Sequence, residues 1–161
     1  MVKTTVHAHL PTKKGSDYTV RRLTISDAPK MFSLEQRSFS LPWNLAQCES
    51  ALNNHKFAAF GLFGLADLLA YISFYAIIDE MEIVNLAVAK ELRRQGYGRF
   101  LLTTALQTGQ KMGMHKVYLE VRKYNQAAIN LYVGCGFQLE GVRKHYYPDT
   151  GEDAFMYGKL L

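Results

Sequence analysis

Apolar residues recur along the chain with two periods, which predict where strands and helices lie. A period of two marks a half-buried strand. It is clearest over residues 116–121, where Val117, Leu119 and Val121 fall on one side and Glu120 falls on the other. Apolar, β-branched and aromatic runs predict further strands at residues 18–23, 57–63, 68–78, 82–88, 137–143 and 154–160.

The second period, of 3.6 residues, predicts a long helix over residues 97–112. Its apolar residues, from Leu101 to Met112, fall on one helical face. Gly113 follows as a typical residue for a helix end.

Three shorter helices complete the predicted order. One has Ser26 as its expected N-cap and Pro29 in its first turn, and it runs to about residue 39. The other two are predicted at residues 45–53 and 126–133. The order β-α-α-β-β-β-α-β-α-β-β indicates one mixed α/β (α+β) domain.

Residues 57–78 are apolar enough to resemble a membrane span, but two features argue against one. Asp67 is the only charge and lies near the middle, where a charge is costly. Gly64 and the residues up to Asp67 form a turn between two aromatic and β-branched runs. The segment is therefore predicted to be a hairpin, and the chain to be soluble.

The composition is that of an ordinary globular protein, with 48% hydrophobic and 20% charged residues in 161. Residues 1–17 are polar and aperiodic, and we expect a loose arm there, followed by one domain over 18–161. Cys48 and Cys135 are far apart and outside any metal-ligand spacing, which favours reduced thiols and a cytoplasmic location. His7 and His9 have no partner ligands nearby, so no metal site is expected.

The formal net charge of +5 is compatible with nucleic acid or with a phosphate-rich cofactor. The basic residues are scattered, and no RNA-recognition, zinc-finger or helix-turn-helix pattern accompanies them. We therefore expect neither direct nucleic-acid binding nor a membrane partner.

A glycine-containing segment lies between the strand at 82–88 and the long helix. It reads Arg93-Arg94-Gln95-Gly96-Tyr97-Gly98-Arg99. Glycines at a helix start let several N–H groups point at one anion, and the helix dipole and three arginines add attraction. This predicts a pyrophosphate site, although an ordinary loop before a helix has similar residues. A Rossmann site fits less well because Leu101 replaces the third glycine, and no P-loop Gly-Lys-Ser/Thr follows.

This segment and several others resemble the GNAT N-acetyltransferases, in particular the branch that acetylates the N-terminal alanine of a ribosomal protein. The matching segments are Phe39–Trp43, Asn85–Val88, Arg93-x-x-Gly96-x-Gly98, Leu119–Arg122, Asn125–Tyr132, Gly136-Phe137, Arg143–Pro148 and Glu152–Ala154. The resemblance covers residues 18–160. It implies a central, mostly antiparallel mixed sheet flanked by helices.

The resemblance also implies site residues for acetyl-CoA and for the peptide. The cofactor-binding positions are Leu86, Ala87, Val88, Arg93, Arg94, Gln95, Gly96, Tyr97, Gly98, Arg99 and Asn125. Glu120 matches the proton acceptor, and Tyr132 matches the donor to the leaving thiolate. Trp43, Tyr146 and Tyr147 lie in segments that line the peptide side in the family.

Elementary chemistry is compatible with these roles. A protein N-terminal ammonium has a pKa of about 7.7–8.0, so a carboxylate acting through water is a sufficient base. Asn125 and Tyr132 lie two helical turns apart on one face. By themselves, a strand-end glutamate is usually solvated, a tyrosine on an apolar face is usually core, and an asparagine at this point is usually a helix cap.

Three functions remain open at this point. The first is acetylation of the N-terminal alanine of a ribosomal protein, and the second is acetylation of a lysine or a small-molecule amine. The third is non-catalytic binding of acyl-CoA, which the presence of both Glu120 and Tyr132 disfavours. The expected partner is a protein N-terminus, and the positive net charge gives no general attraction to a basic ribosomal protein.

Overall fold

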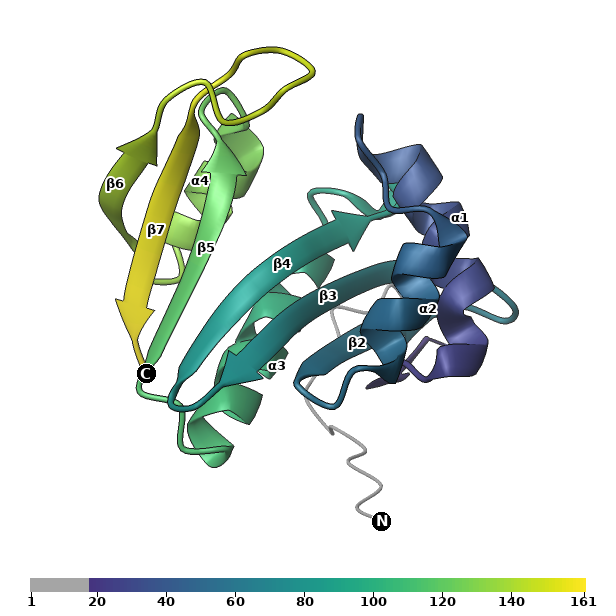
Figure 1. Cartoon of the computed structure of the whole chain (residues 1–161). Helices are drawn as coiled ribbons and strands as arrows, with labels where there is room; N and C mark the ends of the chain where they lie inside the picture. Colours follow the sequence, from purple (N-terminus) through teal and green to yellow (C-terminus); the bar gives the residue numbers. More distant parts are fainter. Residues whose placement is uncertain (1–17) are drawn as a thin grey trace.

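Seven strands form one sheet in the computed structural model, which describes residues 18–161 (Figure 1). In chain order they are β1 (Thr19–Arg22), β2 (Phe57–Phe63), β3 (Leu68–Ile77), β4 (Glu80–Val88), β5 (Lys116–Arg122), β6 (Gln138–Arg143) and β7 (Ala154–Leu160). Their order across the sheet is β1-β2-β3-β4-β5-β7-β6. All neighbours are antiparallel except β4 and β5. The mixed, mostly antiparallel sheet is confirmed.

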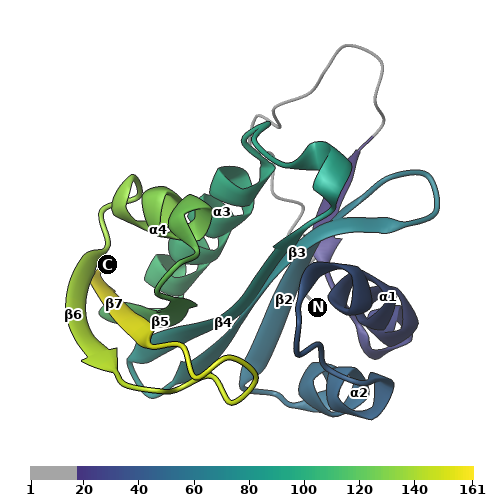
Figure 2. The same ribbon diagram turned by 90° about the horizontal axis from the view of Figure 1, so that it is seen from above.

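Four α-helices cover the two faces of this sheet (Figure 2). They are α1 (Ala28–Ser38), α2 (Leu45–Asn53), α3 (Tyr97–Lys111) and α4 (Gln126–Val133). Two short 3₁₀ helices precede α1 and α3, namely η1 (Ile25–Asp27) and η2 (Lys90–Leu92). The helices α1 and α2 lie on one face, and α3 and α4 lie on the other. The predicted order of strands and helices is therefore confirmed.

Each face has its own hydrophobic core. Under α1 and α2, Met31 and Cys48 pack with Phe57 of β2, and all three are buried. Under α3 and α4, Leu101 and Val117 belong to the larger cluster, which spans both halves of the sheet. Because β5 carries Val117, Leu119 and Val121 into that cluster, its other side chains must face the opposite way.

The two parallel strands separate toward their carboxyl ends. Pairing between β4 and β5 runs only from Glu80 and Lys116 to Ile83 and Leu119. A bulge follows in β4, where the register against β3 shifts between Ile83 and Asn85. Figure 1 shows the two strands adjacent at one end and apart at the other. The separation leaves the backbone of β4 beyond residue 83 without a strand partner on that side.

Several boundaries differ from the sequence prediction. The N-cap is Thr24 for η1 and Asp27 for α1, whereas Ser26 lies inside η1. Asp27 also accepts two bonds from Arg21, and this pairing lowers its pKa to about 2. Met112 follows the end of α3 and is 51% exposed, so its predicted place on the buried face is wrong.

The apolar segment 57–78 forms β2 and β3 with the predicted turn, in which the Gly64 nitrogen donates to the Asp67 carbonyl at 3.0 Å. No helix within residues 18–161 has the length and hydropathy to cross a membrane. The proposed N-terminal arm and His7 and His9 lie outside the described residues.

Candidate active site

A cleft of about 1100 Å³ opens where β4 and β5 separate. Its walls come from the α1–α2 connection, β4, the first turn of α3, β5, α4 and the β6–β7 loop. Segments that are distant in sequence therefore meet around one cavity. Of the site residues predicted from sequence, all line it except Gln95 and Tyr97.

The glycine-containing segment forms one end of the cleft. Gly96 is the N-cap of α3 with φ 91°, a left-handed conformation that glycine adopts readily. Arg94 also has a positive φ, 58°, which is uncommon for a residue with a Cβ. The first N–H groups of α3 have no intrahelical acceptor and bear the positive end of the helix dipole. Together with Arg99, which lines the cleft and donates to the Gly134 carbonyl at 2.9 Å, they form a wall with the chemistry to hold an anion.

Two members of this segment have side chains that point elsewhere. Tyr97 is 2% exposed, and its ring packs edge-on against Tyr18 at 5.7 Å between centroids. The Gln95 amide donates to the Glu91 carbonyl at 2.7 Å. Their side chains anchor the loop from behind, so any contact with a cofactor would come from their backbone.

Glu120 lies on the wall formed by β5. Its carboxylate makes an ion pair with Arg143 of β6, with 2.9 Å between Oε1 and Nε. A hydrogen bond to Glu120, together with burial, raises the pKa of Tyr146. The glutamate side chain is 21% exposed, so it is open to the cleft rather than enclosed. A carboxylate in this position is available to accept a proton.

The opposite wall carries Asn125 and Tyr132 on α4. The Asn125 side chain caps the helix, accepting from the Ala128 nitrogen at 3.2 Å, and it also lines the cleft. Tyr132 is 7% exposed and packs against Phe137, with 5.9 Å between ring centroids. Burial raises the pKa of Tyr132, so its phenol keeps its proton at neutral pH. The residue is thus both part of the core and a lining group of the cleft.

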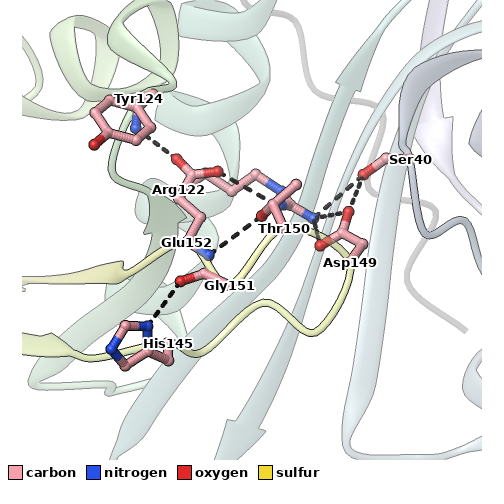
Figure 3. A network of polar contacts seen from close by, with 8 residues as sticks. All are labelled: Ser40, Arg122, Tyr124, His145, Asp149, Thr150, Gly151 and Glu152. Atoms are coloured by element: carbon pink, nitrogen blue, oxygen red, sulfur yellow. Dashed lines mark hydrogen bonds and ion pairs between the residues drawn. The ribbon is translucent and has the colours of Figure 1, made fainter.

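A polar network joins the two sides of the cleft (Figure 3). Arg122, at the end of β5, donates to both oxygens of Asp149 in the β6–β7 loop, at 2.9 and 2.8 Å. Ser40, from the α1–α2 connection, donates to the same Asp149 at 2.9 Å. The Arg122 guanidinium also lies 3.9 Å from the ring centroid of Tyr147. The network therefore ties the β6–β7 loop and Tyr147 to the α1–α2 connection, which also carries Trp43.

A buried carboxylate lies beneath this loop, and no sequence pattern predicts it. Glu35 of α1 is 1% exposed, and burial raises its pKa. Its oxygens accept hydrogen bonds from the Trp43 nitrogen at 2.8 Å, from the Asn85 amide at 3.0 Å and from the Tyr71 phenol. One side chain thus ties the loop of Trp43 to β3 and to the bulged part of β4. The residues are too far apart in sequence for any local pattern to reveal this.

Replacing Glu35 by glutamine should disturb both the fold and this loop. An amide has one acceptor oxygen for three converging donors, so at least one donor is left without a partner at a cost of about 1–3 kcal/mol. We expect urea unfolding to show that loss, with a raised KM for the second substrate and a nearly unchanged KM for acetyl-CoA. Glu49→Gln, on the exposed side of α2, is the control and should lie within about 0.5 kcal/mol of wild type. Equal stability of the two variants would contradict the anchoring role.

Within residues 18–161, no three His, Cys, Asp or Glu side chains gather in a way that could hold a metal ion. The cysteines there are free, Cys48 buried and Cys135 partly buried.

Comparison with known proteins identifies the family. The profile of the Acetyltransferase (GNAT) family matches residues 24–137. The [ribosomal protein bS18]-alanine N-acetyltransferase of Escherichia coli K12 is 33% identical over 140 residues, which is 86% of this chain and 94% of the relative. The crystal structure of the Escherichia coli ribosomal-protein-S18-alanine N-acetyltransferase superposes with a TM-score of 0.83 at 32% identity, covering 89% of this chain and 94% of the other.

A more distant structure shares the fold alone. It is NAA60 of Arabidopsis thaliana in complex with acetyl-CoA, with a TM-score of 0.80 at 15% identity, covering 90% of this chain and 99% of the other. The profile match covers most of the domain and includes the glycine-containing segment and both walls that carry Glu120 and Tyr132. This chain therefore belongs to the acetyltransferase (GNAT) family.

Proposed function

We propose that this protein transfers the acetyl group of acetyl-CoA to the N-terminal α-amino group of a protein, with the alanine terminus of a ribosomal protein as its substrate. One observation carries the proposal: a single cleft combines an anion-binding helix start with Glu120 on one wall and Tyr132 on the other. The named activity of the 33%-identical relative supports the choice of substrate. Such a substrate would be met in the cytoplasm.

The groups in the cleft divide naturally between the two substrates. Arg93, Arg94, Arg99 and the amides of the first turn of α3 would hold the pyrophosphate of acetyl-CoA. The backbone of β4 at residues 86–88 has no strand partner on the β5 side, where the Val88 carbonyl accepts from Arg93 Nε at 3.0 Å. With Asn125 across the cleft, this stretch would hold the pantetheine and the thioester. Trp43, Tyr146 and Tyr147 remain for the peptide.

The chemistry is a direct transfer between the two bound substrates. Glu120 accepts, through water, the proton that the substrate ammonium loses, and the freed nitrogen attacks the thioester carbonyl carbon. The second N–H proton leaves to solvent as the amide forms. Tyr132 donates its phenol proton to the sulfur as the carbon–sulfur bond breaks. The raised pKa of Tyr132, caused by burial, keeps that proton in place until it is needed.

A peptide screen tests the substrate. Peptides that differ only in their first residue are incubated with the protein and acetyl-CoA, and products are measured by mass spectrometry. We expect alanine-starting peptides to be acetylated fastest, because the 33%-identical relative is named for alanine N-acetylation. Acetylation of small amines in preference to every peptide would contradict the proposal. If acetyl-CoA bound but no acetyl group were transferred to any amine, the proposal would also be wrong, and the protein would be a non-catalytic binder of acyl-CoA.

A further inference from the structure

A direct contact joins the two loops that carry Trp43 and Tyr147. The Ser40 hydroxyl donates to Asp149 Oδ2 at 2.9 Å and accepts from the Arg122 guanidinium at 3.2 Å (Figure 3). Within the described part of the chain, the bond between Ser40 and Asp149 is the only hydrogen bond between the α1–α2 connection and the β6–β7 loop. Because the two side chains touch, no peptide chain can pass between them while this bond is made.

The two ends of this contact are held very differently. On the β6–β7 side, Asp149 accepts twice from Arg122, at 2.9 and 2.8 Å. Arg122 in turn donates to Thr150 at 3.1 Å and to Glu152 at 3.4 Å. On the α1–α2 side, the neutral hydroxyl of Ser40 alone makes the link. Loss of the Ser40 contact would therefore leave the β6–β7 loop anchored and free only the α1–α2 side.

The α1–α2 connection has a short stretch that can move at Ser40. The helix α1 ends at Ser38, and the next fixed point is Trp43, whose backbone nitrogen donates to the Glu35 carboxylate at 2.8 Å. Ser40 and Leu41 lie between these two points and are exposed, Leu41 by 53%. An exposed segment with few buried contacts is where local opening is least costly.

We propose that the contact between Ser40 and Asp149 is a latch over the peptide side of the cleft, closed in the free protein and opened at Ser40 when a protein N-terminus enters. This rests on the proposed function of the site. The latch lies away from the glycine-containing segment, where Arg99 and the start of α3 would hold the cofactor. It should therefore act on peptide binding and leave acetyl-CoA binding alone.

A latch of this kind makes an unusual prediction for a substitution in a substrate cleft. When only the open state admits the peptide, the apparent Kd equals the intrinsic Kd divided by the open fraction. Removing the hydroxyl of Ser40 raises the open fraction, so the variant should bind a peptide more tightly than wild type. An amine without a chain beyond its first residue does not have to pass the latch, and its binding should not change.

The test compares wild type with Ser40→Ala on an alanine-starting hexapeptide and on alaninamide, with saturating acetyl-CoA. We expect Ser40→Ala to lower the KM of the hexapeptide about fivefold, the population change that one exposed hydrogen bond produces, without a fall in kcat. The KM values of alaninamide and acetyl-CoA should not change. Ser40→Thr keeps the hydroxyl and should restore the wild-type KM. Ser33→Ala, exposed on α1 and outside the cleft, is the control.

A double-mutant cycle checks that Ser40 acts through Asp149. In an Asp149→Ala background the latch is already broken, so adding Ser40→Ala should change the KM of the hexapeptide much less than it does in wild type. Asp149→Ala also frees Arg122 from its bidentate partner, so only the effect of Ser40→Ala within each background is compared. Equal effects in the two backgrounds would contradict a latch between these two residues.

The backbone at Leu41 reports the latch without any substrate. Nitrogen-15 relaxation of the free protein should give a lower order parameter for the Leu41 amide in Ser40→Ala than in wild type, and the wild-type value in Ser40→Thr. The same order parameter in wild type and Ser40→Ala would overturn the latch, whether or not any amine is acetylated. Melting curves establish that each variant is folded.

The kinetic results can overturn the proposal independently. A hexapeptide KM that is unchanged in Ser40→Ala would do so, and a raised KM would make the contact a clamp that closes over the bound peptide instead. An equal fall in the KM of alaninamide would also contradict it, because that amine has no chain to pass the latch. A wild type that acetylates neither amine counts against the proposed function, and the Leu41 order parameter then decides the latch alone.

Discussion

Tyr132→Phe is expected to slow acetyl transfer by about 10²–10⁴-fold while leaving the affinity for acetyl-CoA and the melting temperature nearly unchanged. Phenylalanine keeps the ring that packs against Phe137 and removes only the hydroxyl. Since burial raises the pKa of Tyr132, the wild-type phenol is protonated across the working pH range and is able to donate. Single-turnover acetylation of an alanine-starting peptide, measured beside a melting curve, gives both quantities.

Tyr157 provides the matched control for this substitution. It is also a buried tyrosine, 6% exposed, but it lies on β7 and does not line the cleft. Tyr157→Phe should therefore leave the transfer rate unchanged. If Tyr132→Phe kept its rate and lost only stability, as a core residue would, the donor role would be wrong.

Gly98→Trp is expected to raise the Kd for coenzyme A by more than about 100-fold, a loss of over 2.7 kcal/mol of binding free energy. A Cβ at position 98 would meet Leu131 at 3.5 Å and Val88 at 3.7 Å, which are ordinary contacts. Alanine therefore fits, whereas an indole must extend into the cleft beside Gly96 and Arg99. Calorimetric titration with desulfo-coenzyme A measures the change.

Gly98→Ala is the graded companion of that variant and should bind with a much smaller loss. Ligand binding should also raise the melting temperature of wild type and of Gly98→Ala but not of Gly98→Trp. Melting curves without ligand establish that the tryptophan variant is folded. Binding of coenzyme A to a folded Gly98→Trp as tightly as to wild type would place the cofactor elsewhere.

Much of the fold was predictable because its signals are local. The alternation over β5 and the apolar face of α3 identify their elements directly, and Gly113, with φ 78°, follows the end of α3 as expected. The N-cap was misplaced because Ser26 and Thr24 have the same capping chemistry. Only the folded chain shows that Thr24 and Asp27 satisfy each other's backbone groups.

The candidate site was predictable in part, for a different reason. Glu120 and Tyr132 were found through resemblance, and the structure places both around one cleft. The direction of the Tyr97 side chain, which is buried away from the cleft, could not be predicted, because a tyrosine between two glycines gives no sign of which way its ring points. Glu35 was missed because its role depends on tertiary contacts. Its hydrogen bond with Asn85 spans 50 positions of the sequence.

The most direct test of the central claim is to locate the acetyl group on a product. An alanine-starting peptide that also contains an internal lysine is incubated with the protein and acetyl-CoA, and fragmentation mass spectrometry assigns the modified nitrogen. We expect one acetyl group, on the α-amine of the alanine, and none on the lysine. Modification of the lysine in preference to the α-amine, or no transfer to either nitrogen, would contradict the claim that this cleft acetylates protein N-termini.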